Sequence, residues 1–127
     1  MRKILTAVIA LSLLNSCSKD NDVLTDKVNA KNAAVVTFIT PNSTASSSLI
    51  VMSNNVKSET KKENFTGENI IEKDLKKNDE IFATISTKEN NTAGMKIKIS
   101  IDGKVVKESN EIKQFGEYKT IDLSYKN

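Results

Sequence analysis

One segment near the middle of the second half of this chain constrains its fold more than any other. In residues 95–101, four apolar side chains alternate strictly with three polar ones. Successive side chains of a β-strand point to opposite faces, so this pattern predicts a strand with one buried and one solvated face. Asp102 and Gly103 follow at once, and this dipeptide favours the two-residue turn of a β-hairpin. The segment therefore predicts an antiparallel hairpin whose second strand covers residues 104–108.

Several other stretches of the chain are also rich in β-branched and aromatic residues, residues 56–62 are polar with weak alternation, and turn-forming residues separate these stretches. They predict strands at residues 34–40, 48–53, 56–62, 69–75, 80–87 and 118–125. Pro41 favours a turn and predicts a stop after the first of these strands. A helix over residues 64–77 is disfavoured by Gly67 and by the β-branched residues that follow it. The pattern predicts an all-β fold, an antiparallel two-sheet β-sandwich of the immunoglobulin-like type with about seven or eight strands.

The first sixteen residues have the character of an export signal. Arg2 and Lys3 precede a mostly apolar run over residues 4–14. This length is typical of the apolar region of a signal peptide, whereas a membrane-spanning helix needs roughly 20 apolar residues. Residues 1–16 are therefore predicted to be a signal peptide that is removed.

The end of this segment contains the only cysteine of the chain. Leu14, Asn15 and Ser16 lead directly into Cys17, and this arrangement resembles the lipobox of bacterial lipoproteins. The resemblance implies cleavage before Cys17, a diacylglyceryl group on its sulfur and attachment to a membrane through lipid. The alternative is an ordinary secretory signal followed by a chance cysteine.

The residues after Cys17 are polar and predict a flexible tether over residues 17–32, before a β-sandwich domain at residues 33–127. The first five resemble the lysine-plus-acidic sorting signal of surface-exposed lipoproteins of Bacteroidota: Ser18, Lys19, Asp20, Asn21 and Asp22. The resemblance implies an outer-membrane location facing outwards. A tether of merely polar composition is the alternative, so the side of the outer membrane that the domain faces stays open.

Charge and composition exclude several function classes. Without Arg2 and Lys3, 17 lysines stand against 16 acidic residues, a net charge of +1 with no arginine. A nucleic-acid partner, which calls for a basic face with arginines, is therefore not predicted. The chain has no histidine, so most nucleophile–base pairs and most zinc sites cannot be assembled. We predict that the protein is not an enzyme and uses no cofactor and no metal.

The layout of the segments between residues 48 and 107, including the stretch ISIDGKVVK, is similar to the small β-sandwich of MmpS-type accessory proteins. Those proteins partner membrane exporters. The resemblance implies the sandwich fold, and it makes a periplasmic transporter-accessory protein one alternative for the function. The disulfide cysteines common in those domains are missing from this chain.

Charged residues provide a few candidate sites. A basic patch on the outside of one sheet could touch anionic headgroups or an acidic glycan, or could simply protect exposed strands from aggregation: Lys96, Lys98, Lys104 and Lys107. Acidic residues that could contribute to a calcium site are interpreted as solvated charges: Asp79 with Glu80, and Glu68 with Glu72. Asp102 is interpreted as a turn residue.

Two classes of function remain. The first is a lipid-anchored, non-catalytic binding or accessory module with a protein or glycan partner, and its candidate binding loops are residues 41–47 and 88–94. The second is a structural envelope lipoprotein without a specific ligand. The sequence does not decide the oligomeric state.

Overall fold

The chain is built from antiparallel strands throughout the part that can be described. The computed structural model describes residues 33–127. Seven strands lie in that range: β3 (Ala33–Ser53), β4 (Val56–Asp74), β5 (Glu80–Thr87), β6 (Lys96–Ile101), β7 (Lys104–Ser109), β8 (Lys113–Phe115) and β9 (Tyr118–Lys126). Every strand pair is antiparallel, which confirms the predicted all-β antiparallel fold.

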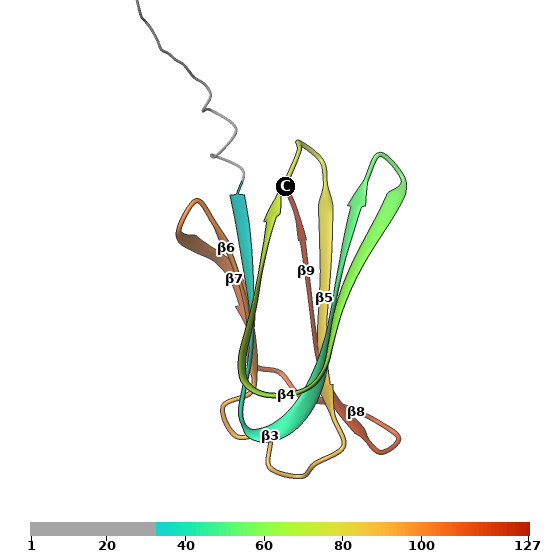
Figure 1. The fold of residues 1–127 in the computed structure, drawn as a ribbon, viewed down its shortest axis with the longest axis vertical. Helices are drawn as coiled ribbons and strands as arrows, with labels where there is room; N and C mark the ends of the chain where they lie inside the picture. Colours follow the sequence, from blue (N-terminus) through green and yellow to red (C-terminus); the bar gives the residue numbers. More distant parts are fainter. Residues whose placement is uncertain (1–32) are drawn as a thin grey trace, which may run out of the picture.

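A long bent hairpin of β3 and β4 organises the sheet. The first half of β3 pairs with β6 and its second half with β5, while β4 follows β3 along both halves. The strand order is β7-β6-β3-β5-β9-β8, with β4 paired to β3 outside this path. All seven strands therefore form one sheet that curls into a half-barrel (Figure 1).

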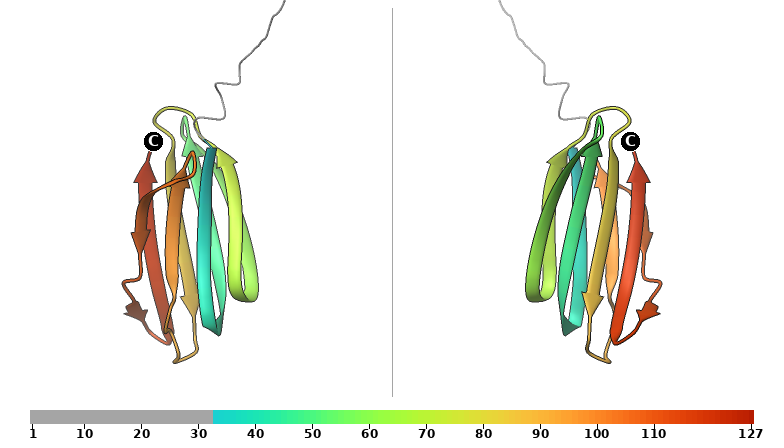
Figure 2. Two further views of the ribbon diagram at one scale, coloured as in Figure 1. Left: turned by 90° about the vertical axis from the view of Figure 1, so that its left-hand side faces the viewer. Right: turned by 90° about the vertical axis from the view of Figure 1, so that its right-hand side faces the viewer.

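The curl has two arms that meet at the bend of β3 and β4. The β6 arm contains β7, β6, the first half of β3 and the second half of β4, and the β5 arm contains the remaining strands and strand halves. Figure 2 shows the two arms from opposite sides. The hydrogen bonding forms one continuous sheet, because β3 and β4 run unbroken from one arm to the other.

The bend lies where the sequence predicted that a strand would stop. Pro41 is inside β3, close to the points where the β3–β4 register shifts on either side of Ala45. The facing part of β4 contains Asn64 and Gly67, whose φ angles are 55° and 97°. Bulges of this kind bend a strand and leave residues outside the ladder, so the missing N–H of a proline is tolerated.

Four segments predicted as separate strands are joined in pairs by this bend. Residues 34–40 and 48–53 belong to β3, and residues 56–62 and 69–75 belong to β4 apart from Leu75. The predicted stop at Pro41 was wrong because the chain changes its pairing partner there without leaving the sheet.

The core lies between the two arms and follows the alternation seen in the sequence. Ile97 and Ile99 of β6 are fully buried, as is Phe38 of β3. The β5 arm contributes a matching set from β5 and β9: Ile81, Ala83, Ile85, Ile121 and Leu123. The predicted inward faces of these three strands are confirmed.

Two tight turns connect neighbouring strands, and the second of them was predicted from the sequence. Asn54 and Asn55, with φ angles of 50° and 63°, connect β3 to β4, and Asp102 and Gly103, at 51° and 82°, connect β6 to β7. Positive φ at both central residues is the signature of the turn that suits a two-residue hairpin.

The predictions for the first part of the chain lie outside the described residues. These are the signal peptide of residues 1–16, the lipidation of Cys17, the tether of residues 17–32 and its sorting signal. Within residues 33–127, no helix has the length and apolar character needed to cross a membrane.

Candidate functional site

A polar cleft of about 410 Å³ lies at the bend end of the molecule. It is formed where the bends of β3 and β4 meet the end of β5 and the start of β9. Its lining is rich in hydroxyl groups and includes two carboxylates, one amine and one aromatic ring: Thr44, Ala45, Ser46, Glu63, Asn64, Ser86, Thr87, Lys88, Glu89 and Tyr118.

The two segments predicted as binding loops are neighbours in the structure, although 40 residues lie between them in the sequence. Residues 41–47 are not a loop, because they form the bend inside β3. The Asn42 side-chain amide donates to the carbonyl oxygen of Ala93 at 2.9 Å. The Thr44 amide donates to the Glu89 carboxylate at 3.2 Å. Residues 41–47 and 88–94 are thus tied together, and both contribute to one wall of the cleft.

Thr87, the last residue of β5, connects these two segments. Its buried hydroxyl donates to the Thr44 carbonyl at 2.7 Å and accepts from the Glu89 amide at 3.1 Å. A hydroxyl has a single hydrogen to donate, and that of Thr87 is directed to the backbone of residue 44. Thr87 therefore shapes the cleft and does not present its hydroxyl to a ligand.

Other hydroxyls of the lining also hold strands at the bend. The Thr44 hydroxyl lies 3.1 Å from that of Thr66, and the Ser86 hydroxyl lies 3.1 Å from that of Thr120. The Ser46 hydroxyl accepts from the Asn64 amide at 3.4 Å. Each hydroxyl can both donate and accept, so these groups keep hydrogen-bonding capacity for a polar molecule in the open part of the cleft.

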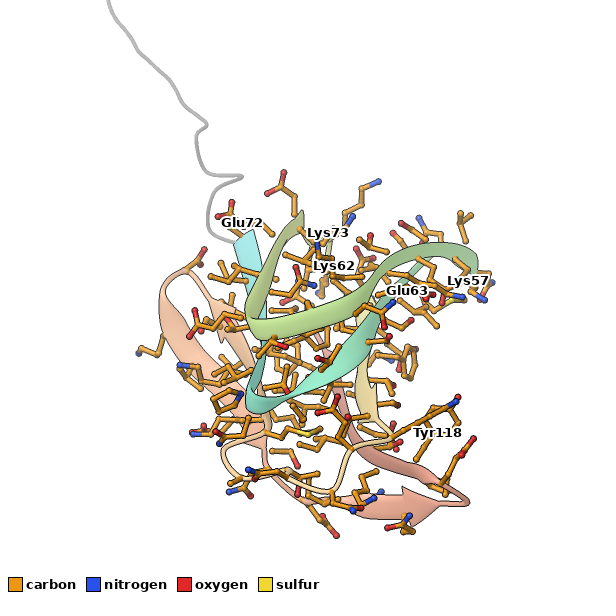
Figure 3. The ribbon with its side chains drawn as sticks, turned by 60° about the horizontal axis from the view of Figure 1, so that its bottom comes forward. Lys57, Lys62, Glu63, Glu72, Lys73 and Tyr118 are labelled. Atoms are coloured by element: carbon orange, nitrogen blue, oxygen red, sulfur yellow. The ribbon has the colours of Figure 1, made fainter. Side chains whose placement is uncertain are left out.

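The outer rim of the cleft carries a cation against an aromatic ring. The Lys88 amine lies 5.3 Å from the centre of the Tyr118 ring and 3.5 Å from the Glu117 carboxylate. The negative charge of Glu117, and then Tyr118, raises the pKa of Lys88 above its usual range. The amine therefore stays charged, and 43% of Tyr118 remains exposed beside it (Figure 3).

The four lysines of the predicted basic patch do not gather on one surface. Lys96 and Lys98 lie on the outer face of β6, where Lys96 pairs with Glu108 at 3.4 Å. Lys107 lies opposite the buried Ile99, and its amine donates to the Ser124 carbonyl at 2.7 Å. Lys104 lies opposite Ile101 on that same inner side. The predicted common patch is therefore wrong, because a β-strand sends alternate side chains to opposite faces.

The acidic residues that were considered for a calcium site lie in different surroundings. Asp79 is buried, and its carboxylate accepts from the Lys76 amide at 2.8 Å. The interpretation of Asp79 as a solvated charge was wrong, since it closes the turn between β4 and β5. Glu68 and Glu72 lie exposed on β4, and Asp102 occupies the predicted turn. Residues 33–127 contain no group of three or more acidic side chains that could hold a metal ion together.

Tyr118, Ser86 and the bend of β4 were not among the predicted site residues. Ser86 and Thr87 are the last two residues of an alternating strand and look like ordinary strand residues in the sequence. The pairing of β5 with β9 places Ser86 opposite Thr120 and thus near the start of β9. Such a contact depends on strand order, for which the sequence has no local signal.

Comparison of the chain with family models, with curated proteins and with solved structures finds no match.

Proposed function

We propose that this protein is a lipid-anchored bacterial lipoprotein of the outer membrane that acts as a non-catalytic binding module. The lipobox-like sequence before Cys17 supports the anchor, and the sequence after it supports a surface-exposed position. Several acyl chains, at about 0.8 kcal/mol per buried methylene group, would make the attachment long-lived.

The position of the cleft carries the proposal for binding. The described domain begins at Ala33, at the free end of the β6 arm, whereas the cleft lies at the bend end (Figure 1). A chain anchored through Cys17 enters the domain at Ala33. The cleft thus lies at the end of the domain opposite the point where the tether enters, where a ligand in the surroundings can reach it.

The composition of the cleft favours a glycan over a hydrophobic ligand. Hydroxyls and carboxylates can match the hydroxyl groups of a sugar, and an exposed aromatic side chain offers an apolar surface with a polar tip. Tyr118 has this role at the rim, with Glu63 and Glu89 among the polar groups. The proposed partner is therefore a surface polysaccharide or the glycan of a host protein.

The arrangement of the cleft supports binding without catalysis. The hydroxyl of Thr87 is occupied by backbone partners, and the hydroxyls of Thr44 and Ser86 lie beside other hydroxyls. An activated nucleophile needs a base within hydrogen-bond reach. The contacts of these three hydroxyls instead serve to hold the strands of the bend.

We extend the proposal to the architecture. The two arms share one core, with Ile97 and Ile99 from the β6 arm and Ile81 and Ile85 from the β5 arm. Two layers around a common core are the basis of an immunoglobulin-like sandwich. In this description the long strands β3 and β4 belong to both layers.

The lipid anchor is tested by replacing Cys17 with alanine in cells that make a C-terminally tagged protein. The wild type is expected to take up an alkyne analogue of palmitate and to remain with the membrane fraction, whereas Cys17→Ala should lose both properties. Changing Lys19, Asp20 and Asp22 to alanine provides the control, because it leaves lipidation intact. In protease shaving of intact cells, this control should keep its tag and the wild type should lose it. Equal labelling of wild type and Cys17→Ala would contradict the anchor.

The glycan site is tested by replacing Tyr118 with alanine and measuring retention on an array of bacterial and host oligosaccharides. We expect binding to fall by at least about tenfold, because the exposed ring at the rim is lost. Phe115→Ala is the matched control, since Phe115 is also exposed but does not line the cleft. Circular dichroism checks that both variants fold. Retention of no glycan by the wild type, or equal binding by the two variants, would rule out this site.

A further inference from the structure

Strand β4 has a long edge without a neighbouring strand in the described domain. It pairs with β3 on one side only. The edge extends over 19 residues and contains no proline. Natural proteins usually keep edge strands short or interrupt them, because unpaired backbone groups attract another strand. This edge is therefore a candidate for pairing with a second chain.

The backbone groups that point away from β3 can be identified in both halves of β4. In the first half, the two-residue turn at Asn54–Asn55 makes Ser53 and Val56 the closing pair of the hairpin. The ladder then alternates, so the backbone groups of three residues face the free edge: Lys57, Glu59 and Lys61.

In the second half, the Asp102 amide donates to the carbonyl of Ala33, so that this residue of β3 faces β6. By alternation, the backbone N–H and C=O groups of Ala34, Val36 and Phe38 point toward β4. Their partners in β4 are Lys73, Ile71 and Asn69. The residues between these partners accordingly direct their backbone groups to the free edge: Glu68, Ile70 and Glu72.

The shape of the edge fixes how two copies of it can meet. β4 passes from one arm to the other between Lys62, which pairs with Ser47, and Gly67, which pairs with Thr40. Two bent edges match along both arms only when a two-fold axis runs through the middle of this bend. The axis then passes between Asn64 and Phe65, and Lys62 of one copy lies opposite Gly67 of the other.

This register also matches the charges on the outer face. It places Lys57 opposite Glu72 and Lys61 opposite Glu68 of the second copy, and each pair occurs twice because of the symmetry. Glu59 lies opposite the uncharged Ile70. No like charges face each other, whereas a shift of two residues in either direction places Glu59 opposite Glu72 or Glu68. Directly opposed like charges destabilise a strand pair and opposite charges stabilise it.

We infer that the β4 edge binds the β4 edge of a second copy of this chain, antiparallel and in this register. Two independent features, the position of the bend and the order of the charges, lead to the same alignment. Figure 3 shows the bend of β4 with Lys57 and Glu72 on either side of it. A two-fold interface of one surface with itself closes the assembly at a dimer.

The symmetry has a consequence for the proposed anchor. Because the axis runs along the arms through the bend, the Ala33 ends of the two copies lie at the same end of the dimer. Both anchors could therefore reach one membrane, with both clefts at the opposite end. This consequence rests on the proposed function, but the dimer itself does not.

The charge pairs provide the first test. The full-length chain is purified in detergent, and its oligomeric state is measured by sedimentation equilibrium at low and high salt. We expect a dimer for the wild type. Reversing one side of the pairs, with Lys57→Glu and Lys61→Glu, should weaken the dimer by at least about tenfold. Reversing the other side, with Glu68→Lys and Glu72→Lys, should do the same. Combining all four substitutions restores opposite charges and should restore the dimer.

The outcomes of this test distinguish the alternatives. A wild type that stays monomeric at about 100 µM overturns the inference. A dimer that either reversal leaves unchanged, or that the four combined substitutions fail to restore in folded protein, overturns the register. Since all these variants keep Cys17 and Tyr118, their failure is distinguishable from failure of the anchor or of the glycan site.

A second test determines the register of the two β4 edges by disulfide cross-linking. Glu59→Cys and Ile70→Cys, combined in one chain, lie opposite each other across the interface but on different arms within a single copy. Mild oxidation should produce a covalent dimer on a non-reducing gel. The wild type, which contains only Cys17, and a chain with Glu59→Cys and Glu72→Cys are the controls. Cross-linking of the shifted control as fast as that of the matched pair would contradict the proposed alignment.

Discussion

Replacement of Phe38 by alanine is expected to destabilise the domain by about 3–5 kcal/mol. Phe38 is completely buried and is among the largest side chains of the core. It lies in the first half of β3, between Ile97 of β6 and Asn69 of β4. Truncation would remove its buried surface and leave a cavity where the strands of the β6 arm meet. Small domains have a total stability of about 5–15 kcal/mol, so the variant should be close to unfolding.

Urea denaturation followed by far-UV circular dichroism measures this change. Phe82→Ala is the matched control, because Phe82 is the same residue type on the outer face of β5 and is 40% exposed. Its truncation should cost well under half as much as that of Phe38. Equal shifts in the two midpoints would show that the alternation in the sequence does not define the inward face of the sheet.

The strands that could be predicted are those that a short stretch of sequence specifies by itself. The alternation that ends at Ile101 and the turn at Asp102 and Gly103 specify a hairpin without reference to the rest of the chain. The same holds for residues 118–125, where Ile121 and Leu123 are buried as predicted. In these segments, side-chain direction and turn conformation depend on neighbouring residues only.

The curl of the sheet could not be predicted because it depends on distant pairing. Pro41 usually ends a strand, but here it lies where β3 exchanges β6 for β5 as a partner. The tolerance of the proline comes from the bulges beside Ala45 and from the matching bend of β4 near Asn64. The resulting single sheet follows from contacts between segments that are far apart in the sequence.

The candidate site was predictable in part for the same reason. Residues 41–47 and 88–94 could be selected as candidate binding loops from their turn-forming composition, and the structure brings them together. The aromatic rim at Tyr118 belongs to a different segment, and only the pairing of β5 with β9 brings it to the cleft. The lysines of β6 and β7 show the opposite case. Lys96 and Lys107 are close in the sequence, but they lie on different faces of the sheet.

Replacement of Gly94 by alanine is expected to be the most disruptive change at the cleft. Gly94 has a φ angle of 80°, and an added Cβ would lie 2.7 Å from the Cγ of Pro41. The positive φ alone costs an alanine about 1–2 kcal/mol. The clash should add about 1–3 kcal/mol, because a proline ring at the bend of β3 cannot turn away as a flexible side chain can.

Gly103→Ala separates these two contributions. Gly103 has nearly the same φ, 82°, but an added Cβ would meet nothing within 4 Å. Both variants bear the backbone strain, and only Gly94→Ala must also push Pro41 away from residues 88–94. Urea denaturation should therefore show a larger loss of stability for Gly94→Ala, and the glycan array should show weaker binding for it at temperatures where both variants are folded. Equal stability losses would mean that residues 41–47 and 88–94 are not packed against each other in solution, and the cleft that depends on this contact would then lose one of its walls.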